Sequence, residues 1–227
     1  MVTLPGSYQV NDDRGRKAAP KPARQEAGLP EQGFVFCNFN QSYKLTPDTF
    51  AGWIRILKRV DGSVLWLLDA AAPFTRNIRR QAEIHGIAPE RMLFAPDRPP
   101  AQHLARLSLA NLFLDGLPYN AHTTASDALW MGVPVITRRG SAFPGRVGAS
   151  LLEAAGLPEL VTEGQQDFEA LAVRLATDHA ALDAMKRKLT RNSPLFDTGL
   201  FRQRIETAYK KMWQAWLAGE KPEGFTV

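Results

Sequence analysis

The run His122-Thr123-Thr124-Ala125-Ser126-Asp127 holds the side chains best suited to chemistry in this chain. It follows an apolar segment over residues 111–115 and a loop rich in glycine, proline and asparagine over 116–120. This order predicts a strand, a loop and the first turn of a helix. Such a turn presents free backbone N–H groups and the positive end of the helix dipole, which suit a phosphate. Asp127, further along the helix, is suited to hold a ribose hydroxyl, so we expect a nucleoside diphosphate site.

A second interpretation of the same run needs no ligand. Thr124 as the N-cap residue, with Asp127 three positions later, resembles a capping box in which aspartate replaces glutamate. The two interpretations are compatible, because the backbone N–H groups of Thr123 and Thr124 can bind phosphate while Asp127 caps the helix or holds a ribose. His122 can stack on a nucleotide or form a hydrogen bond with it, or the loop backbone can satisfy its ring.

Two other segments carry cations that suit such a ligand. Gln41 and Lys44 lie in the loop after a predicted strand over 33–39. A lysine is a compact charge that can reach a diphosphate and stabilise a leaving nucleoside diphosphate without a metal. His103 and Arg106 are three residues apart on a predicted helix, so they share a face and can bracket a base or a phosphate. Without a ligand, these would be an exposed lysine and a half-exposed helix face.

The elements that must position these residues alternate between strand and helix. Strands are predicted over 33–39, 64–68, 92–95, 111–115 and 134–137, with a short edge strand at 160–161. Helices are predicted after an N-cap at Thr46 to about 60, from a cap at Thr75 to 85, and over 100–109, 123–132, 146–155, 168–178, 180–190 and 200–216. This alternation predicts an α/β fold with a doubly wound, mostly parallel, Rossmann-like sheet. Ligands of such sheets bind at the carboxyl ends of strands, where all three candidate groups fall.

The N-terminal part differs in composition from the rest. Residues 1–30 are polar and rich in turn formers, so we predict an extended arm, followed by one lobe over 31–217 and a tail over 218–227. The arm gathers the cations Arg14, Arg16, Lys17, Lys21 and Arg24. Such a cluster usually marks a solvated linker, so nucleic acid is the weakest of the candidate partners.

Composition limits the class of protein. The chain has 227 residues, 44% of them hydrophobic, and a formal net charge of +5 that suits a polyanionic ligand. No apolar run approaches the roughly 20 residues of a membrane span, and the first residues lack the features of a secretory signal. Cys37 is the single cysteine, and the four histidines lack the spacing of metal ligands. We therefore expect a cytoplasmic protein without a membrane partner, a metal or another cofactor.

Several long motifs, in the same order, closely resemble the protein O-GlcNAc transferase family, including its SPINDLY-like branch. They lie at 36–44, 63–68 and 122–134, and 193–197 matches a further stretch near the end of the family sequences. The resemblance spans roughly residues 5–217. It implies a GT-B glycosyltransferase, in which two Rossmann-like lobes face each other across a cleft. This chain resembles the C-terminal, donor-binding lobe of such an enzyme.

The resemblance also implies roles for the candidate residues. Gln41 and Lys44 match a Gln-x-x-Lys pair that contacts the donor, with the lysine at the diphosphate. The triplet His122-Thr123-Thr124 matches the motif that holds the phosphates, and Asp127 matches the aspartate that holds the ribose.

Other parts of the family pattern differ or are missing here. His103 and Arg106 match a His-x-x-Arg pair near the nucleoside, whereas Pro100 stands where the family often has a lysine. The family places tetratricopeptide repeats and an N-terminal catalytic lobe, with an active-site histidine, before this region. We therefore expect contact with a protein acceptor to require that lobe and those repeats.

The leading hypothesis is the donor-binding lobe of a metal-independent, inverting protein O-glycosyltransferase that transfers GlcNAc from UDP-GlcNAc to Ser or Thr. The isolated lobe should show little or no turnover, because no candidate catalytic base is visible in it. GDP-fucose is an alternative donor, since the SPINDLY-like branch shares these motifs. A non-enzymatic nucleotide-binding or subunit-pairing module is the alternative function.

Overall fold

The computed structural model describes all residues from 1 to 227. A six-stranded sheet lies at its centre, and all neighbouring strands are parallel. In spatial order the strands are β4 (Met92–Ala95), β3 (Val64–Leu68), β2 (Val35–Asn38), β5 (Leu112–Leu114), β6 (Val135–Arg138) and β7 (Val161–Thr162). This is the order of a doubly wound, Rossmann-like sheet, so the predicted α/β fold is confirmed.

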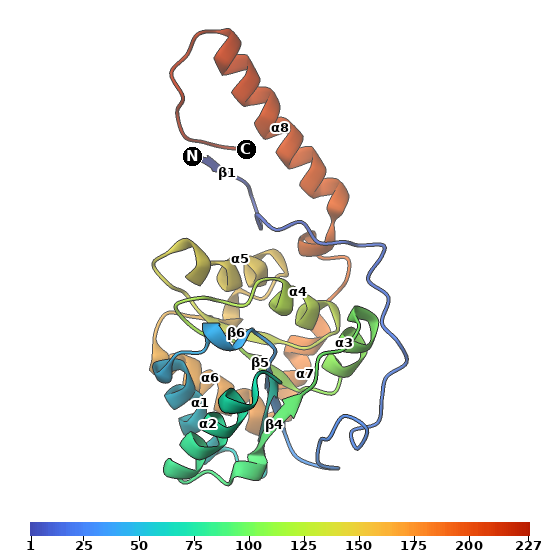
Figure 1. Cartoon of the computed structure of the whole chain (residues 1–227). Coiled ribbons are helices and arrows are strands. Elements are labelled where there is room, and N and C mark those ends of the chain that lie inside the picture. Colours follow the sequence, from blue (N-terminus) through green and yellow to red (C-terminus); the bar gives the residue numbers. More distant parts are fainter.

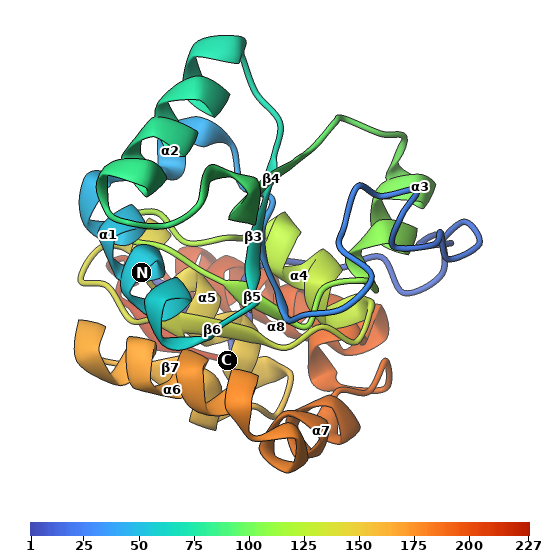
Figure 2. The same ribbon diagram turned by 90° about the horizontal axis from the view of Figure 1, so that it is seen from below.

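Helices cover both faces of the sheet (Figure 1, Figure 2). One face carries α1 (Pro47–Arg59), α2 (Ala72–Ile84) and α6 (Gln165–Thr177), and the other carries α3 (Pro100–Leu107), α4 (Thr123–Trp130) and α5 (Val147–Ala154). Helix α7 (His179–Lys188) packs against α6, and the long α8 (Thr198–Leu217) projects away from the sheet (Figure 1). None of these helices is both long and apolar enough to cross a membrane.

The strands are apolar almost throughout because helices cover them on both sides. A strand with no solvent-facing side loses the alternation of polar and apolar residues. Phe36, Trp66, Phe113 and Ile136, one from each of four strands, are at most 1% exposed. These side chains belong to one continuous core that fixes the register of the sheet.

The strand order identifies where a ligand should bind. From β2 the chain winds to one edge of the sheet through β3 and β4, and from β5 it winds to the other edge through β6 and β7. The direction of winding therefore reverses between the neighbours β2 and β5. In open α/β sheets, ligands bind outside the carboxyl ends of the strands at this switch point. The topology thus favours the loops after β2 and β5 before any side chain is considered.

The N-terminal arm lies against the face that carries α3 and α4 (Figure 2). Ala19 N donates to Ala101 O at 2.9 Å, which fastens the arm to α3. At its start, β1 (Val2–Thr3) pairs in parallel with β8 (Phe225–Thr226), so the two termini lie side by side near α8 (Figure 1). Sequence patterns do not predict this pairing, because two-residue strands leave no periodic signal.

Two predicted helix starts are wrong. Helix α2 begins at Ala72, not after a cap at Thr75, and the Thr75 hydroxyl instead donates to Asp69 Oδ1 at 3.1 Å. Helix α6 begins at Gln165, ahead of the predicted start at residue 168. Its first turn is polar, so no apolar residue before position 168 marks the helix in the sequence.

Candidate functional site

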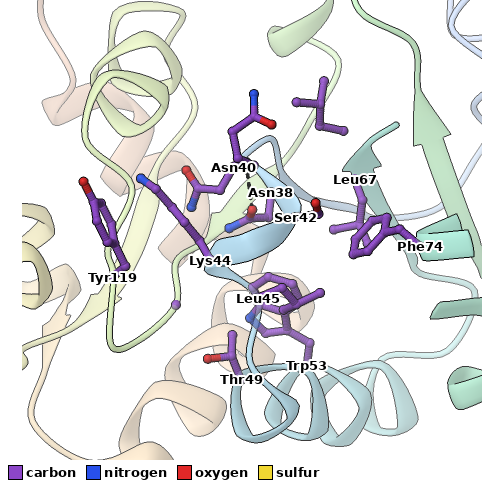
Figure 3. Close-up of a pocket in the computed structure, with 13 residues that line it drawn as sticks. Asn38, Asn40, Ser42, Lys44, Leu45, Thr49, Trp53, Leu67, Phe74 and Tyr119 are labelled. Carbon is purple, nitrogen blue, oxygen red and sulfur yellow. Dashed lines mark hydrogen bonds between the residues drawn. The ribbon is translucent and has the colours of Figure 1, made fainter. Parts of the chain in front are cut away.

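Lys44 connects the loops that follow the two strands at the switch point. A short 3₁₀ turn, Ser42–Lys44, directs the lysine away from β2 toward the loop after β5. Its Nζ donates to Asn120 O at 3.1 Å and lies 3.9 Å from the centroid of the Tyr119 ring. Figure 3 shows the Lys44 side chain extending toward Tyr119 beside the pocket that both residues line. Lys44 therefore lies at the carboxyl ends of the strands, as the sequence predicted.

A buried carboxyl group, Asp115, organises the loop that Lys44 contacts. Asp115 follows β5 and is 2% exposed. It accepts hydrogen bonds from Gly116 N at 2.8 Å, Ala121 N at 2.7 Å and Thr137 Oγ1 at 2.6 Å. Burial raises the pKa of Asp115 to about 7, against the opposing effects of these donors and of Lys44. Burial likewise lowers the pKa of Lys44, and the Asp115 charge opposes that change.

Asn120 extends this network toward the neighbouring helices. It is fully buried and holds its loop on both sides. Its Nδ2 donates to Gly116 O at 2.9 Å, and its Oδ1 accepts from Gly148 N in α5 at 3.1 Å. Because its carbonyl oxygen accepts from Lys44, Asn120 couples the lysine to the same rigid loop.

Helix α4 follows this loop directly, and the capping box predicted at its N-terminus is wrong. Helix α4 begins at Thr123, and His122 occupies the N-cap position without a capping side-chain hydrogen bond. The Thr124 hydroxyl donates to Asn40 Oδ1 at 2.5 Å, and Asp127 pairs with an arginine of the arm. No side chain caps α4, so its first-turn N–H groups remain available to an anion.

His122 is held by the protein through both ring nitrogens. Its Nε2 lies 3.3 Å from Pro144 O, and a carbonyl oxygen can only accept, so this nitrogen carries the proton. Nδ1 then accepts from the Tyr8 hydroxyl of the arm at 3.1 Å. Burial lowers the pKa of His122; the hydrogen bond to Pro144 O opposes this change, and the Lys44 charge adds to it. Both ring nitrogens of His122 are thus satisfied, one by the loop backbone and the other by the arm.

Asp127 lies on α4 and faces the arm. Its Oδ1 is 3.0 Å from Arg16 Nη1, and the same guanidinium donates to Ser126 Oγ at 3.2 Å. Burial raises the pKa of Asp127, and the Arg16 charge opposes that rise. The predicted ribose ligand is therefore a partly buried carboxylate with a fixed cation beside it.

His103 and Arg106 share a face of α3, as their spacing predicts, and contact each other. Arg106 donates from Nε to His103 Nδ1 at 3.2 Å. Both pack on Phe39 after β2, with the guanidinium 5.1 Å and the imidazole 5.4 Å from the centroid of its ring. Burial, aided by the charge of Arg106, lowers the pKa of His103 to about 4. Arg106 is only 5% exposed, so the alternative of a half-exposed helix face is wrong for it.

The remaining predicted residues are exposed at the same edge. Gln41 precedes the turn that carries Lys44, and Thr123 opens α4. No group of three or more His, Cys, Asp or Glu side chains is arranged to hold a metal ion. Several residues of this site were not predicted from the sequence: Tyr8, Asn40, Asp115, Tyr119 and Asn120. The pairing of Arg16 with Asp127 was not predicted either. Only Asp115 left a local signal, since it is a lone acidic residue at the carboxyl end of a buried strand.

A sequence model of the family described as glycosyl transferase family 41 matches residues 12–205. This chain belongs to glycosyl transferase family 41. The resemblance predicted from the motifs at 36–44 and 122–134 is thereby confirmed. Both motifs lie within the matched region; the first supplies the loop after β2 with Lys44, and the second supplies the N-terminus of α4, which follows the loop after β5.

Named relatives of this family 41 chain are much longer. A probable UDP-N-acetylglucosamine–peptide N-acetylglucosaminyltransferase, SEC, from Arabidopsis thaliana is 36% identical over 236 residues, which cover 100% of this chain and 24% of the relative. A probable transferase of the same description, SPINDLY, from Petunia hybrida is 34% identical over 235 residues, covering 98% of this chain and 24% of that protein. The chain thus spans about a quarter of the length of these relatives.

A solved structure supports the same placement in the family. A mutant of the Thermobaculum terrenum O-GlcNAc transferase superposes with a TM-score of 0.77 at 30% identity. The match covers 91% of this chain and 39% of that transferase. The family 41 chain therefore has the fold of one part of a larger O-GlcNAc transferase.

Proposed function

We propose that this chain is the donor-binding lobe of a metal-independent, inverting protein O-glycosyltransferase that transfers GlcNAc from UDP-GlcNAc to Ser or Thr. The observation that carries the proposal is the position of Lys44 at the switch point, where it contacts the loop leading to the uncapped N-terminus of α4. A fixed cation and free N–H groups at one edge of a Rossmann-like sheet suit a diphosphate. The names of the relatives supply the choice of UDP-GlcNAc as donor.

In this proposal the first turn of α4 binds the diphosphate. The backbone N–H groups of Thr123 and Thr124 and the Thr123 hydroxyl would donate to the phosphate oxygens, while the Thr124 hydroxyl would hold α4 against Asn40. His122 would lie beside them. Lys44 would stabilise the charge that develops on the UDP leaving group as the glycosidic bond breaks, and a positioned cation can do this without a metal ion. The network of Asp115 and Asn120 supports this role, because it fixes the backbone against which Lys44 is held.

The nucleoside would extend from the diphosphate toward α3. Asp127 would accept from a ribose hydroxyl, and Gln41 would contact the donor from the loop after β2. His103 and Arg106 would face the base, with Phe39 fixing the orientation of both. A neutral His103 can stack on a base or form a hydrogen bond with it without adding charge.

Catalysis of protein glycosylation would require more than this lobe. The relatives named as transferases are far longer, and this chain spans 24% of the Arabidopsis protein. We propose that an N-terminal lobe with tetratricopeptide repeats binds the acceptor and completes the cleft. This chain alone should then bind the donor but show little or no turnover on a Ser/Thr peptide.

Isothermal titration calorimetry with UDP and UDP-GlcNAc tests the donor site, and GDP and GDP-fucose test the alternative donor. We expect UDP to bind, and Lys44→Ala and Thr124→Ala each to weaken binding, by about tenfold for the lysine. Lys210→Ala, an exposed lysine on α8, is the matched control and should bind like the wild type. Absence of UDP binding, or unchanged binding by both site variants, would refute the assignment, and a preference for GDP would shift the donor to GDP-fucose.

A further inference from the structure

The N-terminal arm carries an arginine that is integrated into the candidate donor site. Arg16 Nη1 is 3.0 Å from Asp127 Oδ1 and donates to Ser126 Oγ at 3.2 Å. The side chains of Arg16 and Asp127 are only 13% and 19% exposed. The backbone of the same arginine is also fixed, because Trp130 Nε1 donates to Arg16 O at 3.2 Å. These contacts set Arg16 apart from the solvated charges expected of a linker.

A second residue of the arm holds Arg16 from the other side. Asn11 is 2% exposed, and its Oδ1 accepts from Arg16 Nη2 at 3.1 Å and from the Ser126 hydroxyl. Its Nδ2 donates to Leu195 O at 3.1 Å, which ties the arm to the turn before α8. The guanidinium is therefore fixed in orientation by groups from the arm and from α4.

The geometry of the ion pair leaves part of Asp127 open to a ligand. Arg16 engages Oδ1, so Oδ2 is available to accept a hydrogen bond from another donor. We propose that Arg16 is a positioning residue that orients the Asp127 carboxylate for the ribose hydroxyls of the donor nucleotide. The inference rests on the proposed function, in which Asp127 holds the ribose. It makes the arm a component of the donor site.

The experiment compares UDP with 2′,3′-dideoxy-UDP, which lacks the ribose hydroxyls, by calorimetry on the full chain. The wild type should bind UDP about tenfold more tightly than the dideoxy nucleotide, since a hydrogen bond to a carboxylate is lost. Arg16→Met should bring the affinity for UDP close to that for the dideoxy nucleotide, while the affinity for the dideoxy nucleotide itself stays unchanged. Arg14→Met is the matched control, because Arg14 lies on the same arm with its side chain 94% exposed.

The possible failures are distinguishable. If the wild type binds neither nucleotide, the proposed function fails. If the wild type prefers UDP and Arg16→Met keeps that preference, Arg16 does not position the ribose ligand and the inference is overturned. An equal loss of affinity for both nucleotides would show that Arg16 only stabilises the fold, and this result would also overturn the inference. Should Arg16→Met not fold, Arg16→Lys keeps the charge but cannot contact Asp127 and Asn11 through two separate nitrogens as the guanidinium does. An unchanged preference for UDP in that variant would contradict the proposal.

Discussion

Lys44 Nζ lies 3.1 Å from Asn120 O, so the cation on the loop after β2 is held by the loop after β5. This contact crosses the reversal of winding in the sheet and joins the two segments that a ligand at that point must touch. It also explains how a lysine on an otherwise exposed loop is fixed in space. A charge held in advance stabilises a developing anion at little further cost in reorganisation.

Replacing Lys44 should affect the diphosphate and not the nucleoside. We expect Lys44→Met to weaken UDP binding by about tenfold, because a charge-assisted contact is lost while the apolar stem is kept. The affinity for uridine should be unchanged, and the loss of affinity for UMP should lie between those for UDP and uridine. Calorimetric titration with the three ligands measures this gradient. An equal loss for UDP and uridine would contradict a role at the diphosphate.

Asp115 should leave a signature in the pH dependence of stability. Its pKa is raised to about 7 in the folded chain, from an ordinary value of 3.8, so the folded state binds a proton more tightly than the unfolded state between these values. The tighter proton binding stabilises the folded state. This contribution of Asp115 to the free energy of unfolding is fully present below pH 4 and is lost as the pH rises through 7. Its slope is at most about 1.4 kcal/mol per pH unit.

Asp115→Asn isolates this effect, because the amide can accept from Ala121 N and donate to the Thr137 hydroxyl but cannot titrate. We expect the free energy of unfolding of the wild type, relative to that of the variant, to fall as the pH rises from 4 to 7. Urea denaturation at several pH values measures the difference. A constant difference would show that Asp115 does not titrate in this range.

His103 should produce the opposite trend in nearly the same range. Its pKa is lowered to about 4 by burial and by Arg106, so between pH 4 and 6.5 the unfolded state binds the proton more tightly. Stability from this group is present above pH 6.5 and is lost as the pH falls through 4. The trends of Asp115 and His103 partly cancel in the wild type, so only single variants can resolve them.

The ring of His103 provides a direct measurement. Its NMR signals should stay constant from pH 8 to about 5.5 and change only near pH 4, and His103→Asn should remove the corresponding loss of stability on acidification. Asparagine is the matched variant, because its Oδ1 can accept from Arg106 as Nδ1 does. Titration of the ring near pH 6.5 would contradict the burial argument.

The sequence alone predicted the fold class and the edge of the sheet that carries the candidate residues. Buried parallel strands leave apolar runs, and parallel topology sends all their carboxyl ends to one edge. Thr46 illustrates a local rule that succeeded, since its hydroxyl caps α1 by accepting from Thr49 N at 3.3 Å. The roles of the candidate residues in binding a donor stay predictions.

Long-range contacts could not be predicted in the same way. Tyr8 meets His122 and Arg16 meets Asp127 across more than a hundred residues, and nothing local in the arm encodes either pairing. The capping box at α4 failed for a local reason. Helix α4 begins at Thr123 with His122 at its N-cap position, so Thr124 and Asp127 both lie inside the helix, where Asp127 pairs with Arg16.

Variants of Thr124 distinguish the contribution of its hydroxyl to UDP binding from the contribution of the backbone N–H groups of α4. Its Oγ1 donates to Asn40 Oδ1 at 2.5 Å, so the hydroxyl links α4 to the loop after β2. Thr124→Val removes the hydroxyl and keeps the shape, and we expect it to weaken UDP binding by about three- to tenfold. Thr124→Ser keeps the hydroxyl and should bind nearly as the wild type does. Because both variants retain the N–H groups of α4, neither should abolish binding measured by calorimetry. If valine and serine behave alike, the backbone alone holds the phosphate and the hydroxyl has no part in binding.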